Sequence, residues 1–526
     1  MKRWTALWLS AVLTVVMLTG MTGAVQVKAS VDGFIFSANG DQSWTVSEYI
    51  GTDAEVVIPS SLDGMPVTAI GYNAFYGCEI TSVTFPDTDI VVGRMAFLLC
   101  KSLKTVTLGR GRTILCDYAF DGCSALETVE VRGEISSLGV GVLARTAYLD
   151  NENNWDGDAL YLGNSLAAVR ESAVGSLAVR EGTTVLADGV FANRTGLEDV
   201  TVPEGVTVIP TAAFEGCTSL KTVALPSTVQ TIGYGAFYSC EALESVDLPE
   251  GLTSIGQVAF FRCRALKEIA IPSGVTVIDF QTFYDCRSLN RLTLSPDTTG
   301  IYHEAFFGCR SLEEVVIPDG VTVIGDRAFM DCFLLSRITV GDNVIQLGKE
   351  VLSGTAYQEH ADNWHDGMLY LEDYLIEVDP DIGGVFTVPE GTTVIGGYAF
   401  WNCDVTEVIF PSSLRAVNNE VFEACKKLTA VYYRGTSAAW ARVQIHPYNR
   451  VLRQMTVQCL GDRKAGDVTG DGVINTADSL RLYAAVSGSL ALGVAERAVA
   501  DQNADGVLNM TDALLLYGLI SGRFIM

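Results

Sequence analysis

Two twelve-residue segments near the C-terminus place oxygen-bearing side chains at alternate positions. They read DVTGDGVINTAD (467–478) and DQNADGVLNMTD (501–512). A calcium loop of this length takes oxygen ligands from positions 1, 3, 5, 7 and 9, a glycine turn at position 6 and a carboxylate at position 12. Both segments fit, so we expect two Ca²⁺ ions. The expected ligands are Asp467, Thr469, Asp471, the Val473 carbonyl, Asn475 and Asp478 in the first loop, and Asp501, Asn503, Asp505, the Val507 carbonyl, Asn509 and Asp512 in the second.

Each loop leads into a segment that we expect to be helical. These segments read TADSLRLYAAVSG and MTDALLLYGLISG, and they match at their leucine and tyrosine positions. A module of about 60 residues has little core of its own, so bound metal would contribute to its folding. An alternative is that the ions only stabilise the fold and serve no partner.

The preceding sequence is periodic. An apolar anchor recurs mostly every 23 residues, at Phe75, Phe97, Phe120, Leu143, Phe191, Phe214, Phe237, Phe260, Phe283, Phe306, Phe329, Leu352, Phe400 and Phe422. Before each anchor, the phrase L-x-x-V/I-x-L/I-P predicts a short strand, and a second apolar run such as 275–278 follows it. A single unit cannot bury its apolar face, whereas stacked units share a continuous core. The sequence therefore predicts a solenoid.

These repeats resemble the BspA-like leucine-rich repeats, with their IG..AF..C..L..V.LP signature, over about residues 31–460. The C-terminal module resembles a type I dockerin, because position 12 is Asp rather than Glu and no helix-forming stretch precedes the first loop. The resemblance implies a β-rich leucine-rich repeat solenoid with a 23-residue period, plus a small all-α dockerin with paired calcium loops. The expected boundaries are a signal peptide at 1–29, an N-terminal cap at 30–74, the solenoid at 75–430, a C-terminal cap at 431–460 and the dockerin at 464–526.

The dockerin resemblance implies calcium-dependent binding to a cohesin module of a scaffoldin. Loop positions 10 and 11 and the following helices then supply the cohesin-binding residues, which we expect to be Thr476, Ala477, Tyr483, Met510, Thr511 and Tyr517. The two halves differ at positions 10 and 11, which argues against the two-orientation binding of symmetric dockerins. Thr469 also departs from the usual Asn at position 3, which should weaken the first calcium site.

Thirteen cysteines raise the question of disulfides. Eleven lie three residues after an anchor and form a ladder with one cysteine per coil; Cys116 and Cys459 lie outside it. Neighbouring positions about 5 Å apart do not exclude bridging, but parallel inward side chains rarely offer the required torsion. We expect buried free thiols. The sequence contains no C-x-x-C pair, which argues against a zinc site.

Two 48-residue gaps between anchors contain related insertions. Trp155 and Trp364 occupy matching places 209 residues apart, which indicates a duplicated block. These tryptophans could stack on a sugar or a partner, but we expect them to pack on the solenoid, since tryptophan is usually mostly buried. We expect His360 and His365 in the second insertion to be solvated rather than bound to metal.

Charge and the N-terminus indicate where the protein acts. The net charge of −27, from 62 acidic and 35 basic residues, argues against nucleic acid or an anionic membrane as partner. Lys2 and Arg3 precede an apolar stretch with possible cleavage at Ala24 or Ala29, as in a secretory signal, although an uncleaved anchor is an alternative. We expect no membrane span after signal cleavage, and a location outside the cell, at its surface or in a cellulosome-type complex.

The expected function is non-catalytic binding. The insertions and caps are too short to form a catalytic domain, so we expect no enzyme activity. The dockerin would attach the chain while the repeats bind a protein or a polysaccharide. Residues beside the predicted strands carry mixed charges and hydroxyls, which leave the ligand open. The alternative is a dockerin-bearing polysaccharide-degrading enzyme (a glycoside hydrolase), which would need two converging carboxylates.

Overall fold

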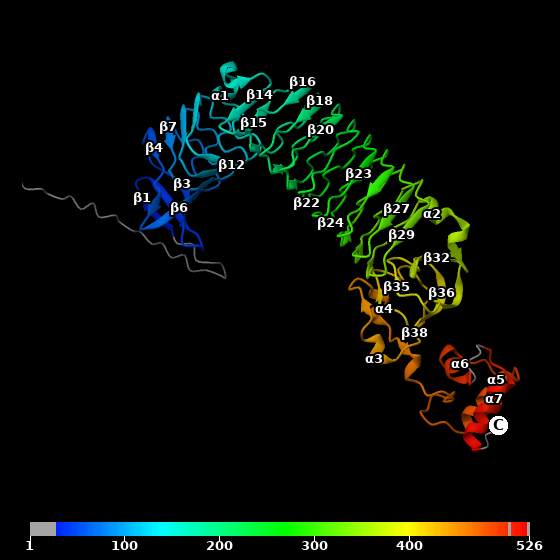
Figure 1. The fold of residues 1–526 in the computed structure, drawn as a ribbon. Coiled ribbons are helices and arrows are strands. Elements are labelled where there is room, and N and C mark those ends of the chain that lie inside the picture. Colours follow the sequence, from blue (N-terminus) through cyan, green and yellow to red (C-terminus); the bar gives the residue numbers. More distant parts are fainter. Residues whose placement is uncertain (1–27, 503–506, 523–526) are drawn as a thin grey trace, which may run out of the picture. The chain divides into compact units, whose positions relative to one another are not determined.

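The structure is a computed structural model that describes residues 28–502 and 507–522 (Figure 1). Most of the expected signal peptide therefore lies outside the described residues. Strand β1 begins at Lys28, so cleavage at Ala24 would leave it whole, whereas cleavage at Ala29 would shorten it. The chain divides into two compact units, residues 1–295 and 296–526.

Most coils of the repeat contain two short strands, as the sequence predicts, although in the coil that begins at Leu243 the first strand is reduced to an isolated bridge between Ser245 and Thr222. In one coil, the L-x-x-V phrase forms β20 (Thr222–Ala224) and the second apolar run forms β21 (Thr231–Ile232). Each strand pairs in parallel with the corresponding strand of a neighbouring coil, as β21 does with β22 (Ser254–Ile255). The structure is thus a β-solenoid with a period of about 23 residues.

The first unit contains β1–β25. An edge sheet runs in the order β1-β2-β3-β6-β8-β10-β12, with β5 beside β6, and the other sheets run β11-β9-β7-β4, β13-β14-β15-β17, β16-β18-β20 and β19-β21-β22. The remaining bounds are β1 (Lys28–Val31), β2 (Phe34–Ala38), β3 (Trp44–Tyr49), β4 (Glu55–Val57), β5 (Ser61–Leu62), β6 (Met65–Ile70), β7 (Ser82–Thr84), β8 (Ile90–Val92), β9 (Thr105–Leu108), β10 (Arg112–Leu115), β11 (Thr128–Val131), β12 (Glu134–Leu138), β13 (Trp155–Asp156), β14 (Ala159–Leu162), β15 (Ser165–Val169), β16 (Val174–Ala178), β17 (Val185–Leu186), β18 (Gly196–Thr201), β19 (Val208–Ile209), β23 (Glu268–Ala270), which pairs with β25 (Arg291–Thr293), and β24 (Val277–Ile278).

The second unit contains further coils and a helical module. Its sheets contain β26-β28-β30, β27-β29, β31-β32-β33-β35-β37-β39 and β34-β36-β38-β40. The bounds are β26 (Gly300–Ile301), β27 (Glu314–Ile317), β28 (Val323–Ile324), β29 (Arg337–Val340), β30 (Gln346–Leu347), β31 (Trp364–His365), β32 (Met368–Leu371), β33 (Tyr374–Val378), β34 (Gly383–Thr387), β35 (Val394–Ile395), β36 (Asp404–Phe410), β37 (Ala416–Val417), β38 (Ala430–Tyr433), α3 (Ser437–Trp440), β39 (Gln444–Ile445), α4 (Arg450–Gln454), β40 (Gln458–Cys459) and the 3₁₀ turn η3 (Leu460–Asp462).

The anchor phenylalanines form the centre of the core. Phe191, Phe214, Phe237 and Phe260 are fully buried, and their rings stack with successive centroid separations of 4.7, 5.1 and 5.0 Å. Such offset stacking adds to the burial of each ring. Where the anchors are phenylalanines, each ring therefore stacks on the ring of the neighbouring coil, at close to the spacing of paired strands.

The cysteine ladder lies beside these rings. All thirteen cysteines are free, so the geometry agrees with the expected free thiols. Most ladder thiols donate a hydrogen bond to the carbonyl oxygen of the preceding coil's anchor, as Cys123 does to Phe97 at 3.1 Å. Burial raises the pKa of Cys217 to about 11 and that of Cys403 to about 12. The neutral thiol is therefore the stable form inside the coils.

The two insertions fold alike. Each has a one-turn helix and a 3₁₀ turn, α1 (Ala147–Asp150) with η1 (Glu152–Asn154) and α2 (Ala356–Glu359) with η2 (Ala361–Asn363). Trp155 donates its indole N–H to the Leu149 carbonyl at 2.8 Å, and Trp364 donates to the Gln358 carbonyl at 2.6 Å. Both tryptophans are half-buried, and these hydrogen bonds tie each indole to the backbone of its own insertion. His360 and His365 are exposed.

The C-terminal module contains α5 (Thr476–Val486), α6 (Val494–Ala500) and α7 (Met510–Ser521). A small core joins them, with Val468, Leu482, Val499 and Leu516 buried. The sequence predicted α5 and α7 but not α6. No helix in the described part of the chain is long and apolar enough to cross a membrane.

Candidate functional site

The first calcium-type loop is closed by its own acidic side chains. Asp467 is buried, and its two carboxylate oxygens accept the backbone N–H groups of Gly470 and Gly472, both at 2.9 Å. Gly472 has φ +84°, a conformation that glycine adopts without strain. The glycine at position 6 thus turns the chain back toward the first ligand position, as the sequence predicts.

Position 12 of this loop lies beside position 3. Asp478 is fully buried, and its Oδ1 accepts from both the backbone N–H and the hydroxyl of Thr469, at 2.7 and 2.8 Å. Its Oδ2 accepts from the Asn475 N–H at 2.8 Å. Burial raises the pKa of Asp478, but these hydrogen bonds outweigh burial, and the net pKa is lowered. The carboxylate is therefore held ionised, as a metal ligand must be.

The second loop is described in part. Asn503 and Asp505 lie outside the described residues. Asp512 is fully buried and accepts from the N–H groups of Gln502 and Asn509, each at 2.9 Å. Asp512 therefore occupies the same place at the start of α7 as Asp478 does at the start of α5.

The donor chemistry of the loops fits Ca²⁺. Every expected ligand is an oxygen, and hard cations prefer oxygen ligands. In the first loop, Asp471 and Val473 flank Gly472, and Asp471 Oδ1 accepts from the Val473 N–H at 2.8 Å. Within residues 28–502 and 507–522, no cluster of three histidine, cysteine or acidic side chains is preassembled. The expected donor set is spread among acids, an amide, a hydroxyl and a carbonyl.

Both helices that follow the loops expose apolar side chains. Tyr483 and Tyr517 are each 54% exposed, and Leu480 and Leu514 are 68% and 64% exposed. We call these four residues the paired helix face. The leucines were not among the expected partner-binding residues, although their i, i+3 spacing from the tyrosines in both halves is a readable signal. Exposed apolar pairs of this kind are typical of protein-binding surfaces.

The loop positions 10 and 11 lie at the start of each helix. Thr476 and Ala477 are exposed at the beginning of α5, and Met510 and Thr511 are exposed at the beginning of α7. The structure therefore brings the expected partner-binding residues onto the same two helices as the paired helix face. The two starts differ most at Met510, whose large apolar side chain is 42% exposed.

On the strand face of the solenoid, many charged side chains are paired with a side chain of opposite charge on the next coil. Charged side chains one coil apart form ion pairs, with N–O distances of 2.6 Å for Lys221–Glu198 and Lys267–Glu244. Further pairs of this type are Arg291–Glu268, Arg337–Glu314 and Lys427–Asp404. Such exposed pairs contribute little to stability, because water screens them. These side chains nevertheless satisfy one another, so they are weak evidence for a ligand.

Comparisons with known proteins agree with the sequence resemblances. The chain matches the BspA type leucine rich repeat region over residues 56–155, 183–309, 254–375 and 299–429, and the dockerin type I domain over residues 465–521. No curated protein gives a significant match.

Solved structures with a similar chain include bacterial leucine-rich repeat proteins. A leucine rich cell surface protein from Faecalibacterium prausnitzii is 23% identical, covering 79% of this chain and 97% of its own, with a TM-score of 0.28. A leucine-rich repeat protein from Bacteroides ovatus is 20% identical, covering 82% and 99%, with a TM-score of 0.35. One from Eubacterium ventriosum is 18% identical, covering 72% and 94%, also with a TM-score of 0.35. These TM-scores are low, so the assignment depends on the sequence families.

Fold and site together define a leucine-rich repeat solenoid with a small helical module at its C-terminal end. The repeat matches extend over more than half of the chain. The protein belongs to the BspA-type leucine-rich repeat family and carries a type I dockerin domain.

Proposed function

We propose that this is a secreted, non-catalytic binding protein whose dockerin docks onto a cohesin of a scaffoldin in the presence of two Ca²⁺ ions. The observation that carries the proposal is the paired helix face, which repeats on α5 and α7 directly after each oxygen-lined loop. Bound calcium would fix each loop and thereby set the orientation of the helix that follows it. The repeats then present a protein- or polysaccharide-binding surface outside the cell.

The deciding experiment measures binding of the full chain to a panel of type I cohesins in Ca²⁺ and in chelator. We expect at least one cohesin to bind in Ca²⁺ and to dissociate on chelation. A Tyr72→Ala variant is the matched control, because that tyrosine is 64% exposed in the first unit. Absence of binding by every cohesin in Ca²⁺ would overturn the docking function.

A further inference from the structure

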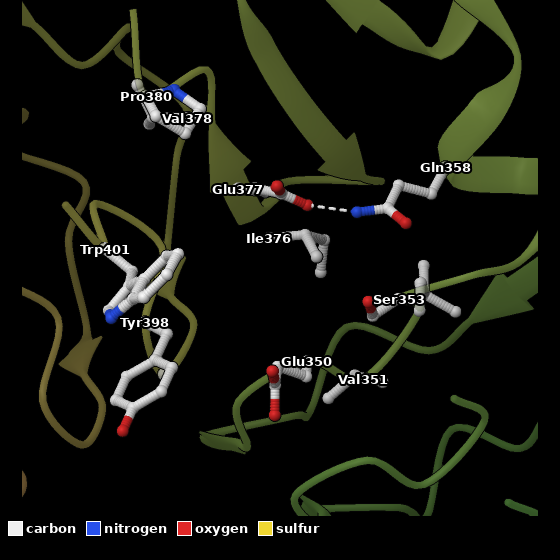
Figure 2. A pocket seen from close by; sticks show the side chains of 12 residues that line it. Glu350, Val351, Ser353, Gln358, Ile376, Glu377, Val378, Pro380, Tyr398 and Trp401 are labelled. Atoms are coloured by element: carbon white, nitrogen blue, oxygen red, sulfur yellow. Dashed lines mark hydrogen bonds between the residues drawn. The ribbon is translucent and has the colours of Figure 1, made fainter. Parts of the chain in front are cut away.

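A cavity of about 340 Å³ lies beside the second insertion (Figure 2). This volume falls at the lower end of the roughly 300–1,000 Å³ typical of small-molecule sites. Tyr398 and Trp401 form one wall, and Gln358 and Glu377 face them across the cavity. No sequence motif marks this site, because its side chains come from three separate segments.

The polar wall is held rigidly. The side-chain amide of Gln358 donates to Glu377 Oε2 and accepts the Gly354 N–H at 2.9 Å. The backbone of Gln358 is fixed as well, since its N–H donates to the hydroxyl of buried Thr355 and its carbonyl accepts from Trp364. Among the described residues, the second carboxylate oxygen of Glu377 has no hydrogen-bond partner. An amide and a carboxylate are therefore preorganised side by side at the cavity.

Two groups of the cavity wall that could attract a cationic ligand, the Glu350 carboxylate and the Tyr398 ring, already have a cation of the protein beside them. Arg327 Nε lies 2.6 Å from a carboxylate oxygen of Glu350, and the Lys349 ammonium lies 4.7 Å from the centre of the Tyr398 ring. Trp401 is 51% exposed, and its ring has no cation over it among the described residues. What remains for a ligand is an open indole surface opposite hydrogen-bonding groups.

The duplicated block provides an internal comparison. The pocket residues Gln358, Glu377, Tyr398 and Trp401 correspond, at an offset of 209, to Leu149, Ala168, Gly189 and Ala192. In that first copy, the guanidinium of Arg194 donates to the carbonyl oxygens of Val169 and Ala192. The strand order β13-β14-β15-β17 of the first copy is repeated as β31-β32-β33-β35 in the second, but these polar and aromatic groups are present only in the second copy.

We propose that the cavity binds one pyranose unit of a neutral polysaccharide. A pyranose ring has apolar C–H faces, which pack on an indole, and hydroxyls at its edge, which hydrogen-bond to an amide and a carboxylate. An acidic polysaccharide would be repelled by Glu377 and by the net charge of −27. The inference rests on the binding role of the repeats in the proposed function and assigns that role a site and a ligand class.

The test titrates the full chain with cello-, xylo-, manno- and galacto-oligosaccharides by calorimetry. We expect one series to bind, and Trp401→Ala and Gln358→Leu each to weaken binding by about tenfold or more. Gln358→Leu introduces the leucine that stands at the corresponding position of the first copy, Leu149. Tyr234→Ala, a control on a 58% exposed tyrosine of the first unit, should leave binding unchanged.

Thermal melting of the same variants establishes that they are folded. Their binding to cohesin separates this proposal from the docking proposal. Sugar binding without cohesin binding supports this site while overturning docking, and the reverse result overturns the site alone. The site is also overturned if binding survives Trp401→Ala, or if a lysine-rich peptide, and no sugar, binds in a Trp401-dependent manner.

Discussion

The thiol of Cys240 donates a hydrogen bond to the carbonyl oxygen of Phe214, one coil earlier, across 3.1 Å. The same carbonyl accepts the backbone N–H of Cys217, also at 3.1 Å. Cys240 is fully buried, so its thiol connects two coils inside the core. A ladder of such contacts explains why the repeat keeps a small residue with a weak donor at this position.

Replacing Cys240 by Ala should lower the free energy of unfolding by about 1–2 kcal/mol, because it leaves a small cavity and removes one weak hydrogen bond. The measurement is the urea unfolding midpoint. Cys116 is half-buried and outside the ladder, so Cys116→Ala should change stability by less than about 0.5 kcal/mol. Equal effects of the two substitutions would show that the ladder contact contributes nothing.

Thiol burial predicts a loss of stability in alkali. The pKa of Cys217 is raised from 9.0 to about 11, chiefly by burial. A raised pKa contributes stability that is complete below pH 9.0 and is lost as the pH rises through about 11, since the unfolded thiol ionises first. Stability measured from pH 8 to 11 should therefore fall less steeply for Cys217→Ala, by at most about 1.4 kcal/mol per pH unit. Parallel curves for the two proteins would contradict this assignment.

Gly109→Ala should destabilise the first unit by about 2 kcal/mol or more. A Cβ at Gly109 would lie 1.8 Å from the carbonyl oxygen of Pro86, and backbone cannot yield as a side chain can. Gly40→Ala is the control, because a Cβ there meets nothing within 4 Å. Thermal melting of the two variants checks the prediction, which fails if Gly109→Ala melts with the wild type.

Much of the fold could be predicted because it is periodic. One anchor per 23 residues requires one coil per anchor, and the glycine at Gly472 turns its loop as the spacing predicts. Helix α6 was missed because it has seven residues, and its main local signal is the contact of the Glu496 carboxylate with the Gly493 N–H. Ion pairs such as Lys221–Glu198 could not be predicted, because they depend on which side chains of neighbouring coils come into contact. The pocket beside the second insertion could not be predicted, because its side chains come from three segments that only the folded chain brings together.

Asp478→Ala should reduce calcium binding of the full chain from two ions to one and loosen the module. The substitution removes a proposed ligand and leaves the N–H groups of Thr469 and Asn475 without their acceptor, which costs about 1–3 kcal/mol. Calorimetry with Ca²⁺ gives the stoichiometry, and hydrogen exchange reports the loss of protection in α5. Asp462→Ala, which changes an exposed acidic residue before the module, is the control. An unchanged stoichiometry would remove Asp478 from the ligand set.

The lowered pKa of Asp478 adds a pH dependence in chelator. A lowered pKa contributes stability that is present above the ordinary value of 3.8 and is lost as the pH falls through the folded value. Protection of α5 should therefore decline below about pH 4 in the wild type but not further in Asp478→Ala. Hydrogen exchange at a series of pH values, corrected for the intrinsic rate, measures this difference.

Cohesin docking should depend mainly on α7. The two halves match at Tyr483 and Tyr517, which are equally exposed, but only α7 begins with an exposed large apolar side chain, Met510. Met510 extends the apolar surface that Leu514 and Tyr517 begin, and a larger desolvated anchor contributes more to binding.

We therefore expect the two tyrosine substitutions to weaken cohesin binding to different degrees. Tyr517→Ala should weaken cohesin binding by about tenfold or more, whereas Tyr483→Ala should weaken it by less than about threefold. Exchanging Met510 and Thr511 for Thr and Ala, the pair found at the start of α5, should also weaken binding while calcium stoichiometry stays the same. These variants are titrated against the cohesin that binds the wild type, with Tyr72→Ala as the control. Equal losses from the two tyrosine substitutions would instead mean that both helices serve as docking surfaces, in two orientations related by the internal symmetry of the module.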